Sequence, residues 1–167
     1  KGMMNLSRAR FPRATLSPML DALARAPLWA EGIEFGHGTG HGVGSYLGVH
    51  EGPQRIAKAV NSQPLLTGMI LSNEPGYYRE GAFGIRLENL IVVEPARPLG
   101  DNRVQLGFET LTFVPFDRRL ILAAELAPGE SAWLDAYHAT VREKLAPLLA
   151  GATLDWLNDV CAPIQTS

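Results

Sequence analysis

The sequence lacks the features that membrane-spanning, disulfide-rich and nucleic-acid-binding proteins need. It has one cysteine, Cys161, which excludes an internal disulfide framework and suits a reducing compartment. No apolar run approaches the roughly 20 residues that cross a bilayer, and no signal peptide is visible at the start. The net charge of -2 and the isoelectric point near 6.1 provide no basic surface. We therefore expect a cytoplasmic protein without nucleic-acid or membrane partners.

The remaining composition is that of a folded chain. Of the 167 residues, 46% are hydrophobic and 19% charged, which is enough to build a buried core. The sequence shows no internal repeat, low-complexity tract or interdomain linker. Its opening at Lys1 resembles the middle of a domain, so we expect residues 1–167 to be part of a longer protein.

The segment 36–45 is the most unusual stretch, because every second residue from 36 to 44 is glycine. Helix is unfavourable there, and an extended strand would project His37 and His41 from one side. His50 follows nine residues after His41. The glycine spacing does not fit a dinucleotide-binding loop, and no phosphate-loop ending occurs. Three clustered histidines instead favour metal or proton-transfer chemistry.

Hydrophobic periodicity predicts helices near both ends of the chain and strands between them. Leucines 16, 20 and 23 predict a short core-facing helix that begins at Ser17 and ends at Pro27, and Thr153 is expected to cap the last helix. This order favours an α+β domain with an antiparallel sheet. A late helix is expected from Gly129 with its apolar stripe at 134, 137, 141 and 145, and strands are expected at 69–73, 84–93 and 106–114, the last with a bulge.

Other conspicuous residues are given structural roles. We expect His138 on the surface of the late helix and assign no role to Cys161. The three tryptophans, at 29, 133 and 156, are expected in the core or in a subunit contact. Residues 54–67 are expected to form an irregular connection.

Glu74 and Glu88 are the candidate acidic ligands. Glu74 interrupts a predicted strand beside Pro75, and Glu88 lies inside an otherwise apolar strand. Taken singly, each is best interpreted as an exposed strand glutamate. If both face the core, their charges need protons or cations. An imidazole and two carboxylates form a partial shell for Mn(II), Co(II) or Zn(II).

Four stretches of the sequence together form a recognisable set. They are HGTGHGVG at 37–44, VHEGP at 49–53, NEPGYY at 73–78 and GIRLEN at 84–89. In this order and spacing they closely resemble the C-terminal half of the catalytic domain of the Xaa-Pro aminopeptidases (aminopeptidase P). These are pita-bread metallopeptidases, as are prolidase, methionine aminopeptidase and creatinase. The resemblance runs from about Phe11 to Trp156.

The resemblance implies a curved antiparallel sheet flanked by helices, as a partial pita-bread fold without its N-terminal half. It implies removal of the N-terminal residue from peptides with proline at the second position, through a water activated by two divalent ions. Manganese is the expected metal, with zinc or cobalt as alternatives. His41, Glu74 and Glu88 would be metal ligands, Glu88 bridging both ions and Glu74 also acting as general base.

The resemblance also implies a substrate site. His37 and His50 would contact the substrate and either stabilise the tetrahedral intermediate or transfer protons. Tyr78 and Arg86 would shape the pocket for proline, whose nitrogen carries no N–H and must be recognised by ring shape.

The sequence departs from the family at two ligands, which are upstream aspartates. The only aspartate before His41 is Asp21, which lies in a predicted helix and matches neither. We therefore expect the isolated fragment to be inactive, and to form a homodimer or associate with the missing N-terminal part. A prolidase-type dipeptidase and a noncatalytic peptide- or protein-binding domain are the alternatives.

Overall fold

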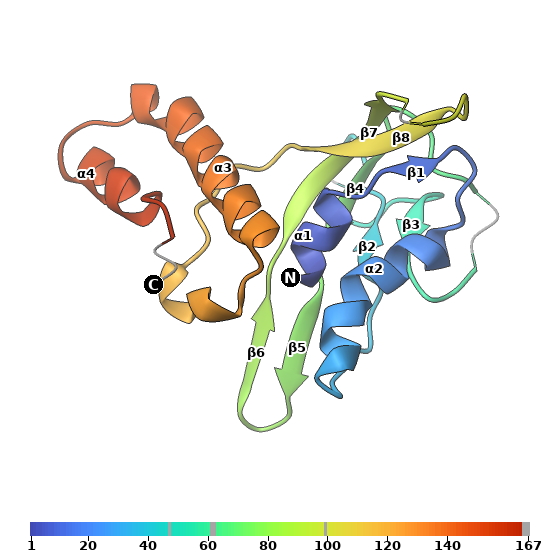
Figure 1. Ribbon diagram of the computed structural model, residues 1–167, viewed down its shortest axis with the longest axis horizontal. Coiled ribbons are helices and arrows are strands. Elements are labelled where there is room, and N and C mark those ends of the chain that lie inside the picture. Colours follow the sequence, from blue (N-terminus) through green and yellow to red (C-terminus); the bar gives the residue numbers. More distant parts are fainter. Residues whose placement is uncertain (47, 61–62, 99, 165–167) are drawn as a thin grey trace. The chain divides into compact units, whose positions relative to one another are not determined.

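A computed structural model describes residues 1–46, 48–60, 63–98 and 100–164 (Figure 1). The chain forms two compact units, residues 1–112 and residues 113–167. The first contains α1 (Gly2–Ser7), β1 (Phe11–Pro12), α2 (Ser17–Ala30), β2 (Gly40–His41), β3 (Arg55–Ile56), β4 (Ile70–Asn73), β5 (Gly76–Arg79), β6 (Phe83–Arg86), β7 (Asn89–Ala96) and β8 (Gln105–Thr110). The second contains the 3₁₀ helices η1 (Arg118–Leu120), η2 (Ala123–Glu125) and η3 (Ala146–Leu148), and the helices α3 (Pro128–Leu145) and α4 (Gly151–Val160).

The first unit is built on a curled antiparallel sheet with strand order β1-β8-β7-β4 (Figure 1). Leu71 of β4 lies opposite Ile91 of β7, and both are fully buried. Their side chains join a core to which α1 contributes Leu6 and α2 contributes Leu20. The sheet and these helices confirm the predicted α+β class. No helix among the described residues is long and apolar enough to cross a membrane.

The predicted strand 84–93 is wrong, because the structure divides it into β6 and β7. Leu87 and Glu88 lie between these two strands. β6 pairs with β5 as a separate two-stranded ribbon, whereas β7 pairs with β4 and β8. Glu88 therefore lies at the junction of two sheets rather than inside a continuous strand.

The last predicted strand is also shorter than expected. β8 ends at Thr110, and its antiparallel pairing with β7 keeps one register from Gln105 to Thr110. The predicted bulge is absent from this pairing, since Leu111 and Phe113, which break the sequence alternation, lie beyond the strand. The connection 54–67 contains the short strand β3, and its residues 61 and 62 lie outside the described residues.

Helix α2 differs from its prediction in length and in its buried face. It continues past Pro27 to Ala30. Leu20 is buried as expected, but Leu16 and Leu23 are exposed. The buried face instead consists of Ser17, Leu20, Asp21, Ala24 and Arg25, at the spacing of one helical stripe.

Gly40 lies where β2 passes closely beside β4. A Cβ atom at this position would overlap the carbonyl oxygen of Ser72, whereas a Cβ at Gly36 would meet no atom within 4 Å. We expect Gly40→Ala to destabilise the protein by about 2 kcal/mol or more, because backbone must move. Gly36→Ala is the matched control and should leave the denaturation midpoint nearly unchanged. Equal midpoints for the two variants would contradict this packing.

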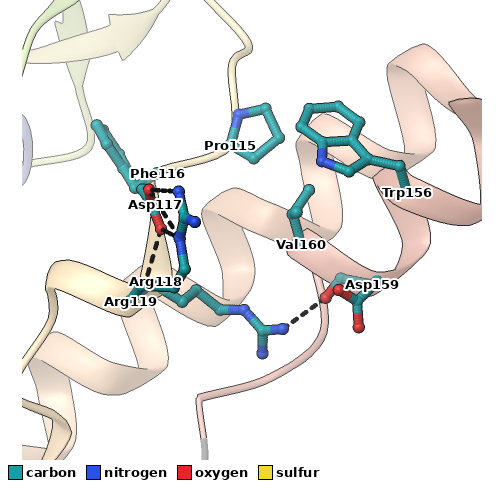
Figure 2. Close-up of a pocket in the computed structure, with 8 residues that line it drawn as sticks. All are labelled: Pro115, Phe116, Asp117, Arg118, Arg119, Trp156, Asp159 and Val160. Atoms are coloured by element: carbon teal, nitrogen blue, oxygen red, sulfur yellow. Dashed lines mark hydrogen bonds and ion pairs between the residues drawn. The ribbon is translucent and has the colours of Figure 1, made fainter.

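The second unit buries the predicted stripe of α3, with Leu134, Tyr137 and Val141 buried. α4 begins at Gly151, before Thr153, so the predicted cap is wrong. Arg118 of η1 holds the end of α4 by donating to the carbonyl oxygens of Asp159, Ala162 and Pro163. Arg118 lines a pocket of about 560 Å³. The Arg119–Asp117 ion pair lines the same pocket (Figure 2).

The predicted aromatic and cysteine roles have mixed outcomes. Trp133 packs on the core cluster of the second unit. Trp29 and Trp156 are both about half exposed, so they lie outside the core, and the alternative of a subunit contact stays a prediction for them. Cys161 is buried in the core of the second unit and has a packing role that the sequence did not indicate.

His138 is fully buried, which corrects the predicted surface position. Its Nε2 accepts a hydrogen bond from the backbone N–H of Phe116, so the neutral ring carries its proton on Nδ1. Burial is the main cause that lowers the pKa of His138, and the charge of Arg118 lowers it further. The folded protein therefore holds this ring neutral at a pH where the unfolded chain binds a proton.

The buried His138 predicts acid sensitivity. The pKa of His138 is lower in the folded than in the unfolded state. Above about pH 6.5 the ring is neutral in both states, so it does not change the free energy of unfolding. Below that pH the unfolded chain binds a proton that the folded protein does not, so the folded protein loses stability. We expect the thermal midpoint to fall between pH 7.5 and 5, and to fall less in His138→Gln. The same pH dependence in both proteins would contradict this assignment.

Candidate metal and substrate site

The glycine-rich segment is mostly irregular, which corrects the predicted long strand. Only Gly40 and His41 pair as β2, against β3. The segment is nevertheless fixed beside β4, because the Glu74 N–H donates to the Thr39 carbonyl at 2.8 Å and the His41 N–H donates to Ser72 Oγ at 3.0 Å. These two bonds place His41 next to Glu74.

A ring nitrogen of His41 and a carboxylate oxygen of Glu74 face each other, and both are hydrogen-bond acceptors when the His41 ring is neutral. His41 Nδ1 lies 2.9 Å from the Gly42 carbonyl oxygen, and a carbonyl only accepts, so Nδ1 is the donor. In the neutral ring Nε2 is then an acceptor, and it lies 3.1 Å from the carboxylate oxygen Oε1 of the largely buried Glu74. This contact requires a proton or a cation between the two atoms. A histidine whose other ring nitrogen donates to a carbonyl is the usual geometry of a metal ligand.

Arg86 links the two candidate acidic ligands. Its Nη1 lies 3.1 Å from Glu74 Oε2 and 3.9 Å from Glu88 Oε2, so one positive group serves both carboxylates. The Glu88 side chain is 43% exposed, unlike that of Glu74. Among the described residues, no group of three or more histidine, cysteine or acidic side chains is closely enough arranged to hold a metal ion. The guanidinium thus provides here the positive charge that the acids require.

The candidate ligand atoms of His41, Glu74 and Glu88 are of the types that bind a divalent cation. An imidazole nitrogen and two carboxylates are the ligand types that such ions prefer. The opposed acceptors of His41 and Glu74 also need a positive group. A metal held by these residues and Glu88 would take the charge-balancing place of Arg86.

A directed chain of hydrogen bonds connects Arg86 with His37. Arg86 Nε donates to Tyr78 Oη at 3.0 Å, and this bond is the main cause that raises the pKa of Arg86. His37 Nδ1 lies 2.7 Å from the Gly38 carbonyl and so donates to it, which leaves Nε2 to accept from the Tyr78 hydroxyl at 2.8 Å. Three of the four predicted substrate residues, His37, Tyr78 and Arg86, therefore meet at one hydroxyl group.

His50 packs against His41. Its ring centroid is 4.1 Å from that of His41, and the residue is exposed. His37 instead packs beside Phe35 and Tyr78. The structure brings His41 together with both Glu74 and His50, and connects His37 to Glu74 through Tyr78 and Arg86.

Sequence reasoning missed the buried polar residues that support this site. Asn73 donates to the Met3 carbonyl and to Ser7, which ties the residue before Glu74 to α1. Asp21 was predicted to lie in a helix and does, but its buried partner Arg25 was not singled out. The i, i+4 spacing of Asp21 and Arg25 on the stripe that contains Leu20 was the available signal.

Two family models and several curated proteins match this chain. A family model described as metallopeptidase family M24 matches residues 1–95, and one described as the C-terminal region of peptidase M24 matches residues 105–164. A probable Xaa-Pro aminopeptidase P from Tuber melanosporum is 48% identical over 98% of this chain. Aminopeptidase P1 from Arabidopsis thaliana is 44% identical over 100% of it. The chain spans 28% and 26% of these relatives, about a quarter of their length.

Solved structures of aminopeptidases and prolidases also resemble this chain. An X-prolyl aminopeptidase from Caenorhabditis elegans, described as a cytosolic enzyme with a di-nuclear active site, superposes with a TM-score of 0.90 at 38% identity. The match covers 98% of this chain and 27% of that one. A prolidase from Pyrococcus horikoshii has a TM-score of 0.50 and 29% identity, over 65% of this chain and 28% of its own.

Proposed function

Because this chain belongs to metallopeptidase family M24, we propose that it is the C-terminal part of a pita-bread catalytic domain that removes the residue before proline from the N-terminus of peptides. The predicted family and curved-sheet fold are confirmed. The His41–Glu74 contact carries the proposal, because an imidazole nitrogen and a largely buried carboxylate face each other close to Glu88, where a divalent cation would balance the charge that Arg86 balances in this structure.

Within this proposal, His41, Glu74 and Glu88 are ligands from this chain to two divalent ions. Manganese suits the mixed imidazole and carboxylate set, and zinc and cobalt are the alternatives. When bound, such ions supply Lewis-acid chemistry, polarising the scissile carbonyl and lowering the pKa of water. Glu74, held by Ser72 Oγ at 3.1 Å, acts as the base that accepts the proton of the attacking water.

The remaining residues bind and orient the peptide. His37 and His50 contact the substrate near the scissile bond, where a ring N–H can donate to the developing oxyanion. His37 Nε2, which accepts from the Tyr78 hydroxyl in this structure, becomes such a donor when it takes up a proton. Tyr78 and Arg86 form one wall, fixed by the bond between their Oη and Nε atoms. The Tyr78 ring, which is partly exposed, offers an apolar surface to a proline ring.

The aminopeptidase is favoured over a prolidase-type dipeptidase because the curated relatives that match 98% or more of this chain are named aminopeptidases. The aminopeptidase from Caenorhabditis elegans matches 98% of this chain, and the prolidase from Pyrococcus horikoshii matches 65%. The direct test is steady-state cleavage of an Xaa-Pro-Xaa peptide by the manganese-loaded full-length protein, beside an Xaa-Pro dipeptide. We expect the longer peptide to be cleaved and preferred. Cleavage of the dipeptide alone indicates a prolidase, and cleavage of neither contradicts the peptidase proposal.

We also propose that the apolar face of the first unit is covered in the full-length protein. Phe83, Ile85 and Leu87 of the β5–β6 ribbon and its end are exposed. Ile85 and Leu87 line an open pocket with Leu28 and Tyr77. An exposed apolar ribbon of this kind needs a partner. The N-terminal part of the catalytic domain is the proposed occupant, and a second copy in a homodimer is the alternative.

The 167-residue chain alone should be inactive. It contributes three proposed ligands, and its described residues form no group of three that holds a metal ion. We expect calorimetric titration with Mn²⁺ to show no tight site and peptide assays to show no turnover. Co-expression with the preceding part of the protein should restore both. Two tight sites in the isolated chain would contradict this expectation.

A further inference from the structure

The Arg25 side chain in α2 uses all of its hydrogen-bond donors, although it is only 1% exposed. Nε and Nη2 donate to the two carboxylate oxygens of Asp21, at 2.6 and 3.2 Å. Nη1 donates to Glu34 Oε1 at 2.6 Å and to the Phe35 carbonyl at 2.8 Å. The second Nη2 bond reaches the carbonyl oxygen of His37 at 2.6 Å. Since arginine has five N–H donors, none is left over.

The contacts of Glu34, the second acidic partner of Arg25, keep its carboxylate ionised. Glu34 is bound by Lys58 Nζ at 2.8 Å and by the Trp29 indole N–H. Burial acts to raise the pKa of Glu34, but the hydrogen bonds from Lys58, Trp29, the Phe35 backbone and Arg25 outweigh it and lower that pKa to about 2. The Arg25–Glu34 pair therefore persists through the neutral range.

Arg25 and its partner Asp21 each bind directly to the segment that carries His37 and His41. Arg25 fixes the His37 carbonyl, and Asp21 Oδ1 accepts from Thr39 Oγ1 at 2.6 Å. The Thr39 carbonyl in turn accepts the Glu74 N–H. The helix thus holds the segment by the backbone carbonyl of His37 and by the side chain of Thr39, while the His37 ring contacts Tyr78.

We propose that Arg25 is a positioning residue for catalysis, which fixes the backbone of His37 so that its ring meets Tyr78 and the substrate. This inference rests on the proposed function, because it takes His37 to be a substrate-contacting residue. Arg25 itself touches no substrate. The five contacts differ in direction, and a lysine ammonium with three donors cannot make all of them.

The energetics support a role in placement rather than in stability alone. Burying an ionic network costs desolvation energy, and well-packed apolar residues often replace such networks without loss of stability. An apolar side chain at position 25 would leave the carbonyls of Phe35 and His37 without this donor. The network therefore serves to fix the backbone at His37, the residue proposed to contact the substrate.

The test is a double-mutant cycle in the manganese-loaded full-length protein with Arg25→Lys and His37→Ala. A backbone shift near 1 Å costs on the order of 10²-fold in rate, so we expect Arg25→Lys to lower kcat/KM by about that factor while the protein remains folded. In the His37→Ala background the same change should cost much less, because most of its effect passes through His37 and only the smaller part that passes through Asp21 and Thr39 to Glu74 remains. An unchanged kcat/KM, or an equal loss in both backgrounds, would overturn the proposal.

Arg118→Lys is the matched control. Arg118 also donates to three backbone carbonyls, but at the end of α4 in the second unit. Its replacement should lower the thermal midpoint without changing kcat/KM. If Arg25→Lys does not fold, Thr39→Val removes the bond to Asp21 while preserving side-chain shape, and the same pattern of kinetic loss and non-additivity is expected from it.

A second measurement separates this inference from the proposed function. Hydrogen exchange should rise in residues 35–41 and at the Glu74 amide in Arg25→Lys, and should not rise there in Arg118→Lys. If the wild-type protein cleaves no Xaa-Pro peptide, the proposed function fails, whereas the exchange result still decides whether Arg25 holds this segment. Unchanged exchange in Arg25→Lys would refute the holding role, even in an active enzyme.

Discussion

Glu74→Gln in the full-length protein should lower kcat/KM for an Xaa-Pro-Xaa peptide by about 10³-fold or more, since general-base and metal-ligand functions are lost together. The substitution keeps the shape of the side chain but removes its negative charge. The group facing His41 Nε2 and Arg86 Nη1 would then be a neutral amide, which would no longer attract a cation. Bound metal, measured by elemental analysis after dialysis, should fall in the same variant.

The control for Glu74→Gln is Glu109→Gln. Glu109 is exposed on β8 of the same sheet and is given no role in the site. It should retain wild-type kinetics and metal content. A Glu74→Gln variant that keeps its kcat/KM within tenfold of the wild type would remove Glu74 from both proposed roles.

His37→Ala should lower kcat/KM by about 10²–10³-fold, the usual cost of losing one donor to a developing oxyanion. The loss should appear in the kinetics and leave metal content unchanged, because His37 is not among the proposed ligands. This split distinguishes His37 from Glu74.

Tyr78→Phe is the companion variant for His37. It removes the hydroxyl that joins His37 Nε2 to Arg86 Nε but leaves the aromatic ring. Its effect should have the same direction and be smaller than that of His37→Ala. An effect of His37→Ala on metal content alone would mean that His37 is a ligand rather than a substrate contact.

Local patterns were sufficient where one short segment determined the structure. β4 follows its predicted span closely, and the interruption at Glu74 comes where Pro75 and Gly76 indicated it. The apolar stripe of α3 is buried because its residues recur at helical spacing. Sequence motifs also selected His41 and Glu74, whose side chains do meet.

Local patterns failed where distant segments decide the outcome. His138 is buried because Phe116, twenty-two residues away, donates to it and its ring packs in the second unit. β6 and β7 separate because their partners, β5 and β4, belong to different sheets. The role of Arg25 depends on carbonyls ten and twelve residues ahead, which no periodicity analysis of α2 can contain.

The central claim is that His41, Glu74 and Glu88 hold divalent cations in the full-length enzyme. Anomalous diffraction from crystals of that protein grown with Mn²⁺ tests it most directly. The claim predicts manganese bound to His41 Nε2 and to both carboxylates, with Arg86 displaced from its position between Glu74 and Glu88. Manganese bound at other side chains, with Arg86 still bridging the two carboxylates, would contradict it.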